Sequence, residues 1–171
     1  MDPITKIKKE GVFEGVTPYH WLVVIIASCG WLFDCMDQRI FALSREPAIR
    51  ELLGGGAEEA TIGNLLGLAT GSMMIGWATG GIIFGIMSDR WGRVKTMVVT
   101  LLVYSGFTGL SGISHNVYDF MVYRFLVGLG VGGMFGSATA LVAESVPSGF
   151  RSMALGSLQA LSACGNIIGS L

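Results

Sequence analysis

Two long stretches of this chain contain no Asp, Glu, Lys or Arg. The first covers residues 60–88 and the second covers residues 96–118. A helix needs about 20 predominantly apolar residues to cross the hydrocarbon core of a bilayer, and both stretches are long enough. They therefore predict membrane-spanning helices, and an all-α, polytopic membrane helix bundle is the fold class that we expect.

The composition of the whole chain agrees with this class. Hydrophobic residues make up 51% of the sequence and charged residues 13%, whereas a soluble domain usually carries about 25% charged residues. The formal net charge of −1 gives no basic surface for a nucleic acid. The three cysteines lie in apolar runs without the spacing of metal ligands or redox pairs, so we expect no metal, cofactor or disulfide.

The distribution of apolar residues predicts five membrane spans. They run roughly from His20 to Ala42, Ile62 to Met87, Thr96 to Ser114, Phe120 to Ala143 and Met153 to Leu171. We expect residues 1–19 to precede the membrane and residues 20–171 to form the membrane domain. No polar cap or charged stop follows the last span, which predicts that the sequence is a fragment of a longer protein.

The positions of Lys and Arg predict the orientation of the chain. Seven cations fall on one side of the predicted spans: Lys6, Lys8, Lys9, Arg90, Arg93, Lys95 and Arg151. On the other side, Arg39, Arg45 and Arg50 are mixed with acidic residues. Because cytoplasmic loops carry an excess of Lys and Arg, we expect a cytoplasmic N-terminus in the cell membrane. A secretory signal peptide is disfavoured, because the first apolar stretch is long and contains two Asp residues.

The link between the second and third spans has the pattern G-x-x-x-D-R-x-G-R, followed by a further cation. Its residues are Gly85, Asp89, Arg90, Gly92, Arg93 and Lys95. Gly92 permits a tight turn that a Cβ hinders, and the cations hold the loop at the cytoplasmic face. A generic basic loop needs these cations but neither Asp89 nor two glycines at these offsets. The pattern resembles the signature between the second and third helices of the major facilitator superfamily of secondary transporters.

A second charged pattern, E-x-x-P-x-x-x-R, ends the fourth span with Glu144, Pro147 and Arg151. Proline stops the helix at this point and turns the chain. The pattern is also similar to one that the superfamily carries here. This resemblance implies that Glu144 pairs with Arg93 and that Arg151 joins them. We expect such a latch to form in one transport state and to loosen in another.

Besides Glu144, three ionisable residues of the predicted spans matter most, because a charge inside a membrane is costly and usually marks a function. Asp34 and Asp37 share a helix face and lie on the order of 7–12 Å from the outer end of the first span. Arg124 enters the fourth span from the same side at a comparable depth. We expect these side chains to meet. A structural ion pair without a transport role is the alternative.

Both charged segments resemble parts of the superfamily. Arg124 followed by glycines is similar to the fourth helix, which lines the central cavity together with the first helix. The resemblance implies that Arg124 holds an anionic substrate or modulates the proton affinity of the acids. Asp34-Cys35-Met36-Asp37 resembles the first helix of proton-coupled importers of organic and aromatic acids, or of sialic acid and sugars, with Cys35 in place of a glycine. Two close carboxylates repel each other, which favours proton binding by one of them.

Glycines recur at every fourth residue in three of the spans, a spacing typical of faces where membrane helices pack closely. They are Gly63, Gly67 and Gly71, then Gly128, Gly132 and Gly136, then Gly165 and Gly169. We expect Gly130 to take part in this packing as well. It also belongs to a G-x-G-x-x-G run, but this run lies in a membrane span and follows no strand, which argues against a dinucleotide site.

The resemblance covers residues 21–171 and implies the N-terminal half of a twelve-helix transporter, with the sixth helix and the C-terminal half absent. It also implies proton-coupled alternating access. Expected partners are a small organic anion or sugar-like substrate, protons, the lipid bilayer and the C-terminal half. An enzyme is disfavoured, because His20 and His115 stand alone. A truncated structural or regulatory membrane module remains the alternative.

Overall fold

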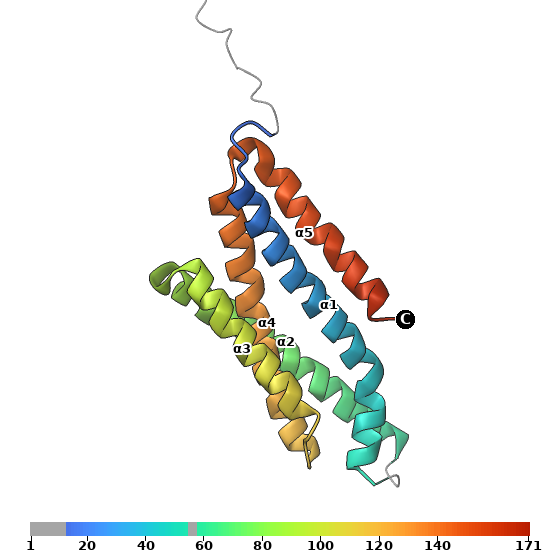
Figure 1. Ribbon diagram of the computed structural model, residues 1–171. Coiled ribbons are helices and arrows are strands. Elements are labelled where there is room, and N and C mark those ends of the chain that lie inside the picture. Colours follow the sequence, from blue (N-terminus) through green and yellow to red (C-terminus); the bar gives the residue numbers. More distant parts are fainter. Residues whose placement is uncertain (1–12, 55–57) are drawn as a thin grey trace, which may run out of the picture.

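Five α-helices form the computed structural model, which describes residues 13–54 and 58–171 (Figure 1). The helices are α1 (Pro18–Leu52), α2 (Glu59–Trp91), α3 (Arg93–Ser111), α4 (Val117–Ser145) and α5 (Ser148–Ile168). No strand occurs in these two ranges, and the expected all-α class is confirmed. The predicted cytoplasmic cations Lys6, Lys8 and Lys9 lie outside the described residues.

Helix α1 continues about three turns past the end expected from hydropathy, through Pro47 to Leu52. Two contacts favour this extension. The side chain of Ile49 is fully buried, and Arg50 forms an ion pair with Glu46 one turn earlier. Packing and an i,i+4 ion pair therefore support the helix beyond its apolar part.

Four of the helices, α1 to α4, are long and apolar enough to cross a membrane, as judged over the residues that the structure describes. Helix α5 has 21 residues and is not among these four; polar side chains such as Gln159 and Asn166 interrupt its apolar stretches. Its buried residues Phe150, Ala154 and Leu158 recur every four positions and so line one face. The assignment of α5 as a fifth span stays a prediction.

Large apolar side chains cover much of the outer surface. Ile82 of α2 and Leu102 of α3 are exposed, as are many of their apolar neighbours on the same helices. A monomeric soluble protein rarely exposes contiguous apolar surface of this extent. Lipid tails solvate such a surface, and the chain is accordingly a multi-pass membrane protein.

Helix α4 lies at the centre of the bundle. It packs against α2 and α3, while α5 runs beside α1 (Figure 1). At the crossing of α2 and α4, a Cβ would collide with the backbone of the other helix at four glycines: Gly76, Gly80, Gly128 and Gly132. Small residues thus allow these two backbones to approach closely.

The glycine contacts differ in register from the pattern expected on α2. Gly130 faces α3, where a Cβ would meet Thr100 and Tyr104. Four glycines of the expected pattern have no described atom within 4 Å of an added Cβ: Gly63, Gly67, Gly71 and Gly136. The close backbone contacts of α2 with α4 fall on Gly76 and Gly80 instead.

Two hydrophobic clusters fill the interior, one toward each end of the bundle. We call the end where α2 meets α3 and α4 meets α5 the hinge end, and the opposite end the loop end. The hinge-end cluster includes Val24, Ala27, Val142, Phe150 and Leu158. The loop-end cluster includes Phe41, Ile49, Ile62, Phe120 and Val127.

Candidate functional site

Two groups of charged residues stand out, and the first lies at the hinge end. Helix α2 ends at Trp91 and α3 begins at Arg93, so Gly92 alone joins them. Its φ of +97° lies in the region that favours glycine. The Gly92 amide donates to the Ser88 carbonyl oxygen, and its own carbonyl accepts from Thr96. This one-residue link places the first side chain of α3 beside the end of α4.

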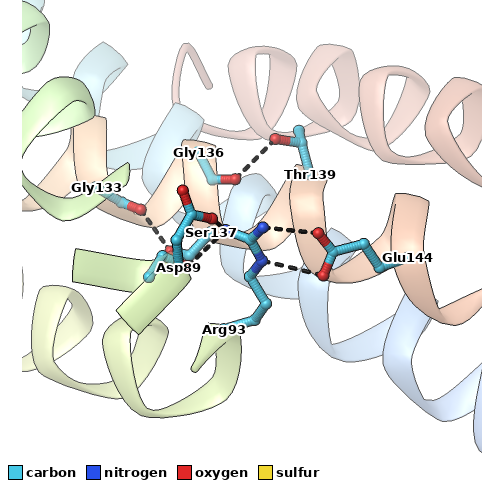
Figure 2. A network of polar contacts seen from close by, with 8 residues as sticks. Asp89, Arg93, Gly133, Gly136, Ser137, Thr139 and Glu144 are labelled. Carbon is cyan, nitrogen blue, oxygen red and sulfur yellow. Dashed lines mark hydrogen bonds and ion pairs between the residues drawn. The ribbon is translucent and has the colours of Figure 1, made fainter. Parts of the chain in front are cut away.

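Arg93 connects the hinge to the end of α4 (Figure 2). Its Nη2 lies 2.6 Å from Glu144 Oε1 and its Nε lies 3.1 Å from Glu144 Oε2, which makes the pair bidentate. Its Nη1 pairs with Asp89 and donates to Ser88 Oγ at 3.2 Å. Bidentate pairs of this kind are the strongest ion pairs that arginine makes. The Glu144 side chain is nevertheless 57% exposed, so water and salt screen the contact.

The other cations of the two charged patterns take no part in this contact. Arg90, Lys95 and Arg151 are exposed, and none of them forms an ion pair within the described part of the chain. Pro147 occupies the N-cap position of α5. A Cβ at Gly85 meets no described atom within 4 Å. The structure therefore joins Asp89, Arg93 and Glu144 and leaves Arg151 outside, although the resemblance implied that it would join them.

The second group lies toward the loop end, around a cavity of about 370 Å³ between α1, α3 and α4. Its polar lining includes Asp37 and Ser44 of α1, Thr108 and Ser111 of α3, and Arg124 of α4. Phe41 and Phe120 add two aromatic rings. A cavity that is partly apolar and has a few convergent polar groups is typical of a small-molecule site.

Arg124 is the most unusual side chain of this cavity, because only 7% of it is exposed. Its Nη2 donates to Ser111 Oγ at 2.7 Å. Its guanidinium carbon lies 4.1 Å from the centre of the Phe41 ring and 5.2 Å from that of Phe120. The remaining nitrogens, Nε and Nη1, have no hydrogen-bond partner among the described residues. A buried guanidinium with free donors is equipped to receive an anion.

The two aspartates of α1 differ in their surroundings. Asp34 is 1% exposed and accepts a hydrogen bond of 2.9 Å from Gln38 Nε2 at its Oδ2. Asp37 lines the cavity, and its Oδ2 has no described partner. Neither carboxylate lies within 4 Å of the Arg124 nitrogens in the described residues. The structure thus places Asp37 and Arg124 at one cavity, without a direct ion pair, and leaves Asp34 off its lining.

Comparison with known proteins identifies the family. The Major Facilitator Superfamily matches residues 21–171. The chain belongs to the Major Facilitator Superfamily. It is 35% identical to the sialic acid transporter NanX of Escherichia coli over 157 residues, which are 91% of this chain and 37% of that protein.

Two relatives from Acinetobacter baylyi are also similar. The benzoate transport protein is 31% identical over 80% of this chain and 29% of its own length. The niacin transporter NiaP is 29% identical over 88% of this chain and 32% of its own length. The chain therefore spans about a third of the length of these relatives. No solved structure matches it significantly. These relatives are named as transporters and not as enzymes.

Within this superfamily member, several contacts of the charged residues were not expected from the sequence. Phe41 lies one turn after Asp37, and Phe120 lies one turn before Arg124. The spacing of four places each ring on the same helix face as its charged neighbour, and this signal was present in the sequence. Ser111 had no such signal, because it comes from the end of a third helix.

No cluster of three His, Cys, Asp or Glu suited to a metal occurs in the described ranges.

Proposed function

We propose that this sequence forms the N-terminal half of a proton-coupled transporter that moves a small organic anion by alternating access. The observation that carries this proposal is the guanidinium of Arg124. It is buried, it faces a cavity shared with Asp37, and two of its nitrogens have no described partner. Leaving buried donors unpaired is costly, and a bound anion removes that cost.

The names of the relatives support an anionic substrate. These proteins are named for the transport of benzoate, niacin and sialic acid. Each of these compounds carries a carboxylate at neutral pH. We propose that the substrate of this protein is likewise a carboxylate. Its carboxylate oxygens accept hydrogen bonds from the N–H groups of Arg124.

Asp34 and Asp37 supply the proposed proton site. Arg124 is the cation that shares a cavity with Asp37. An anion bound to Arg124 offsets its positive charge, which makes protonation of the nearby carboxylate more favourable. Substrate and proton then strengthen each other's binding, because coupling between two sites is reciprocal. Gln38 orients Asp34 for this role through its hydrogen bond.

We further propose that the hinge end faces the cytoplasm and that Arg93, Asp89 and Glu144 form a latch there. The latch joins the α2–α3 hinge to α4 through the bidentate contact. A second half of the transporter supplies the opposing wall of the cavity and the element against which these helices rock. The exposed position of Glu144 allows the latch to open at small cost during each cycle.

An uptake assay with charged and neutral analogues tests the proposal. The full-length protein is reconstituted in proteoliposomes, with an inward proton gradient or without one. We expect gradient-driven accumulation of at least one of benzoate, nicotinate and sialic acid, and no uptake of the matched neutral amides benzamide and nicotinamide. Equal uptake of acid and amide would contradict anion binding. Accumulation that is independent of the proton gradient would contradict proton coupling.

A further inference from the structure

Two phenylalanine rings hold the guanidinium of Arg124 from different helices. Phe41 belongs to α1 and is 5% exposed, and Phe120 belongs to α4 and is 3% exposed. Their ring centres lie 6.2 Å apart, at an interplanar angle of 37°. The guanidinium carbon lies nearer to Phe41, at 4.1 Å from its centre. A cation at this distance is attracted by the negative face of the ring.

This arrangement replaces the ion pair that a buried arginine normally makes. A buried charge is usually paired with an opposite charge. Asp37 lines the same cavity, yet no carboxylate of the described residues lies within 4 Å of an Arg124 nitrogen. The rings of Phe41 and Phe120 and the hydroxyl of Ser111 are the contacts that hold it instead.

Holding Arg124 away from Asp37 has a consequence for both groups. A direct Arg124–Asp37 pair would occupy the donors that an anion needs and the carboxylate that a proton needs. Any fraction of molecules in that paired state lowers the apparent affinity for an anion in proportion.

We propose that Phe41 is a positioning residue for anion recognition, which holds Arg124 through a cation–π contact and so prevents its collapse onto Asp37. The inference rests on the proposed function, in which Arg124 receives the anion. A purely structural role of Phe41 in the loop-end cluster is the competing explanation. The two explanations differ, because packing depends on side-chain volume while the cation–π contact depends on the electron density of the ring.

Fluorinated phenylalanines separate these explanations, because they weaken the ring quadrupole with little change in shape. Residues with one, two and three ring fluorines are placed at position 41 of the full-length protein. Dissociation constants for benzoate, nicotinate and sialic acid are measured by calorimetry. We expect a stepwise weakening that reaches about 3- to 30-fold with three fluorines. The same series at Phe107, which is partly buried and stacks on Tyr123, is the matched control and leaves the dissociation constants unchanged.

A double variant gives a second readout that a packing role does not produce. Phe41→Leu weakens anion binding, and adding Asp37→Asn restores most of the affinity, by a larger factor than Asp37→Asn alone gives in the unaltered protein, because the carboxylate that competes for Arg124 is gone. A flat fluorine series, or a double variant that binds no better than Phe41→Leu alone, overturns the inference.

The variant Arg124→Gln separates failure of this inference from failure of the proposed function. If Arg124→Gln binds the anions with the same affinity as the unaltered protein, both the inference and the proposed function fail. If Arg124→Gln abolishes binding while the fluorine series stays flat, only the role of Phe41 fails. Absence of binding of all three anions to the unaltered protein counts against both.

Discussion

Arg93 and Arg124 both lie near carboxylates, but among the described residues only Arg93 forms ion pairs with them. Arg93 is half-buried and makes a bidentate pair with Glu144 and a second pair with Asp89, two carboxylates that are open to solvent. Arg124 is buried, touches two rings and a hydroxyl, and has two nitrogens without a described partner. The difference separates a contact between helices from a site with unused binding capacity.

The comparison also shows how exposure sets the cost of breaking a contact. Water replaces the partner of an exposed charge at little cost, so an exposed pair suits a latch that opens and closes. A buried donor has no such replacement, so leaving it without a hydrogen-bond partner costs free energy. The hinge end is therefore suited to a change of state and the loop-end cavity to a ligand.

The largest expected effect concerns the two aspartates near Arg124. Asp34→Asn and Asp37→Asn remove the carboxylates that we assign to proton binding. We expect both variants to lose gradient-driven accumulation, while at least one keeps substrate exchange, which needs no net proton movement. Uptake and exchange are measured side by side in proteoliposomes. Accumulation by both variants with an unchanged pH profile would show that these acids are structural.

The latch is expected to give the next largest effect. Arg93→Glu or Glu144→Arg alone places like charges opposite each other and impairs transport. The swap of both residues restores the sign relation and part of the activity. Two residues in direct contact show such a pairing as non-additive effects of the two substitutions. A double swap that behaves as the sum of the two single losses would break the proposed pairing.

The packing of α2 against α4 gives an effect on stability. Gly128→Ala inserts a methyl group against the backbone of α2, and overpacking of this kind costs about 1–3 kcal/mol. Thermal unfolding in detergent measures the loss. Gly136→Ala is the matched control on the same helix, because its Cβ meets no described atom within 4 Å. Equal loss from both substitutions would contradict the described helix contact.

The smallest expected effect concerns an exposed ion cluster. Arg50 pairs with both Glu46 and Glu59 at the loop end. Glu59→Gln removes one partner and leaves the other, and water screens both, so we expect a smaller loss in the free energy of unfolding than Gly128→Ala causes. A larger loss in thermal unfolding would mean that exposure is a poor guide to the cost of breaking ion pairs in this protein.

The sequence permits prediction where one local pattern determines the structure. Charge-free stretches longer than a bilayer predicted the helices, and Gly92 between charged residues predicted the tight turn that the structure shows. Hydropathy predicted a membrane span that ends near Ala42 but not the rest of α1, because burial of Ile49 and the Arg50–Glu46 pair support a helix whose last turns are not apolar.

Features that depend on how the helices cross could not be predicted from the sequence. The four-residue glycine repeat of α2 has the correct period, but the crossing point with α4 decides which glycines touch, and it selects Gly76 and Gly80. The expected meeting of Arg124 with two aspartates rested on depth alone. Depth does not specify the direction of a side chain. Arg124 shares a cavity with Asp37 but lies against Phe41 and Ser111, without an ion pair to either aspartate in the described residues.

Calorimetry on two arginine variants tests the central claim, that the buried Arg124, which has no described carboxylate partner, is the anion site and that Arg93, which pairs with exposed carboxylates, is not. Binding of benzoate, nicotinate and sialic acid is measured for the full-length protein, for Arg124→Gln and for Arg93→Gln. We predict that Arg124→Gln abolishes binding without lowering thermal stability, because it removes a buried charge that has no carboxylate partner. Arg93→Gln keeps the dissociation constant within about twofold, since its contacts lie at the other end of the bundle. Undiminished binding by Arg124→Gln would contradict the account.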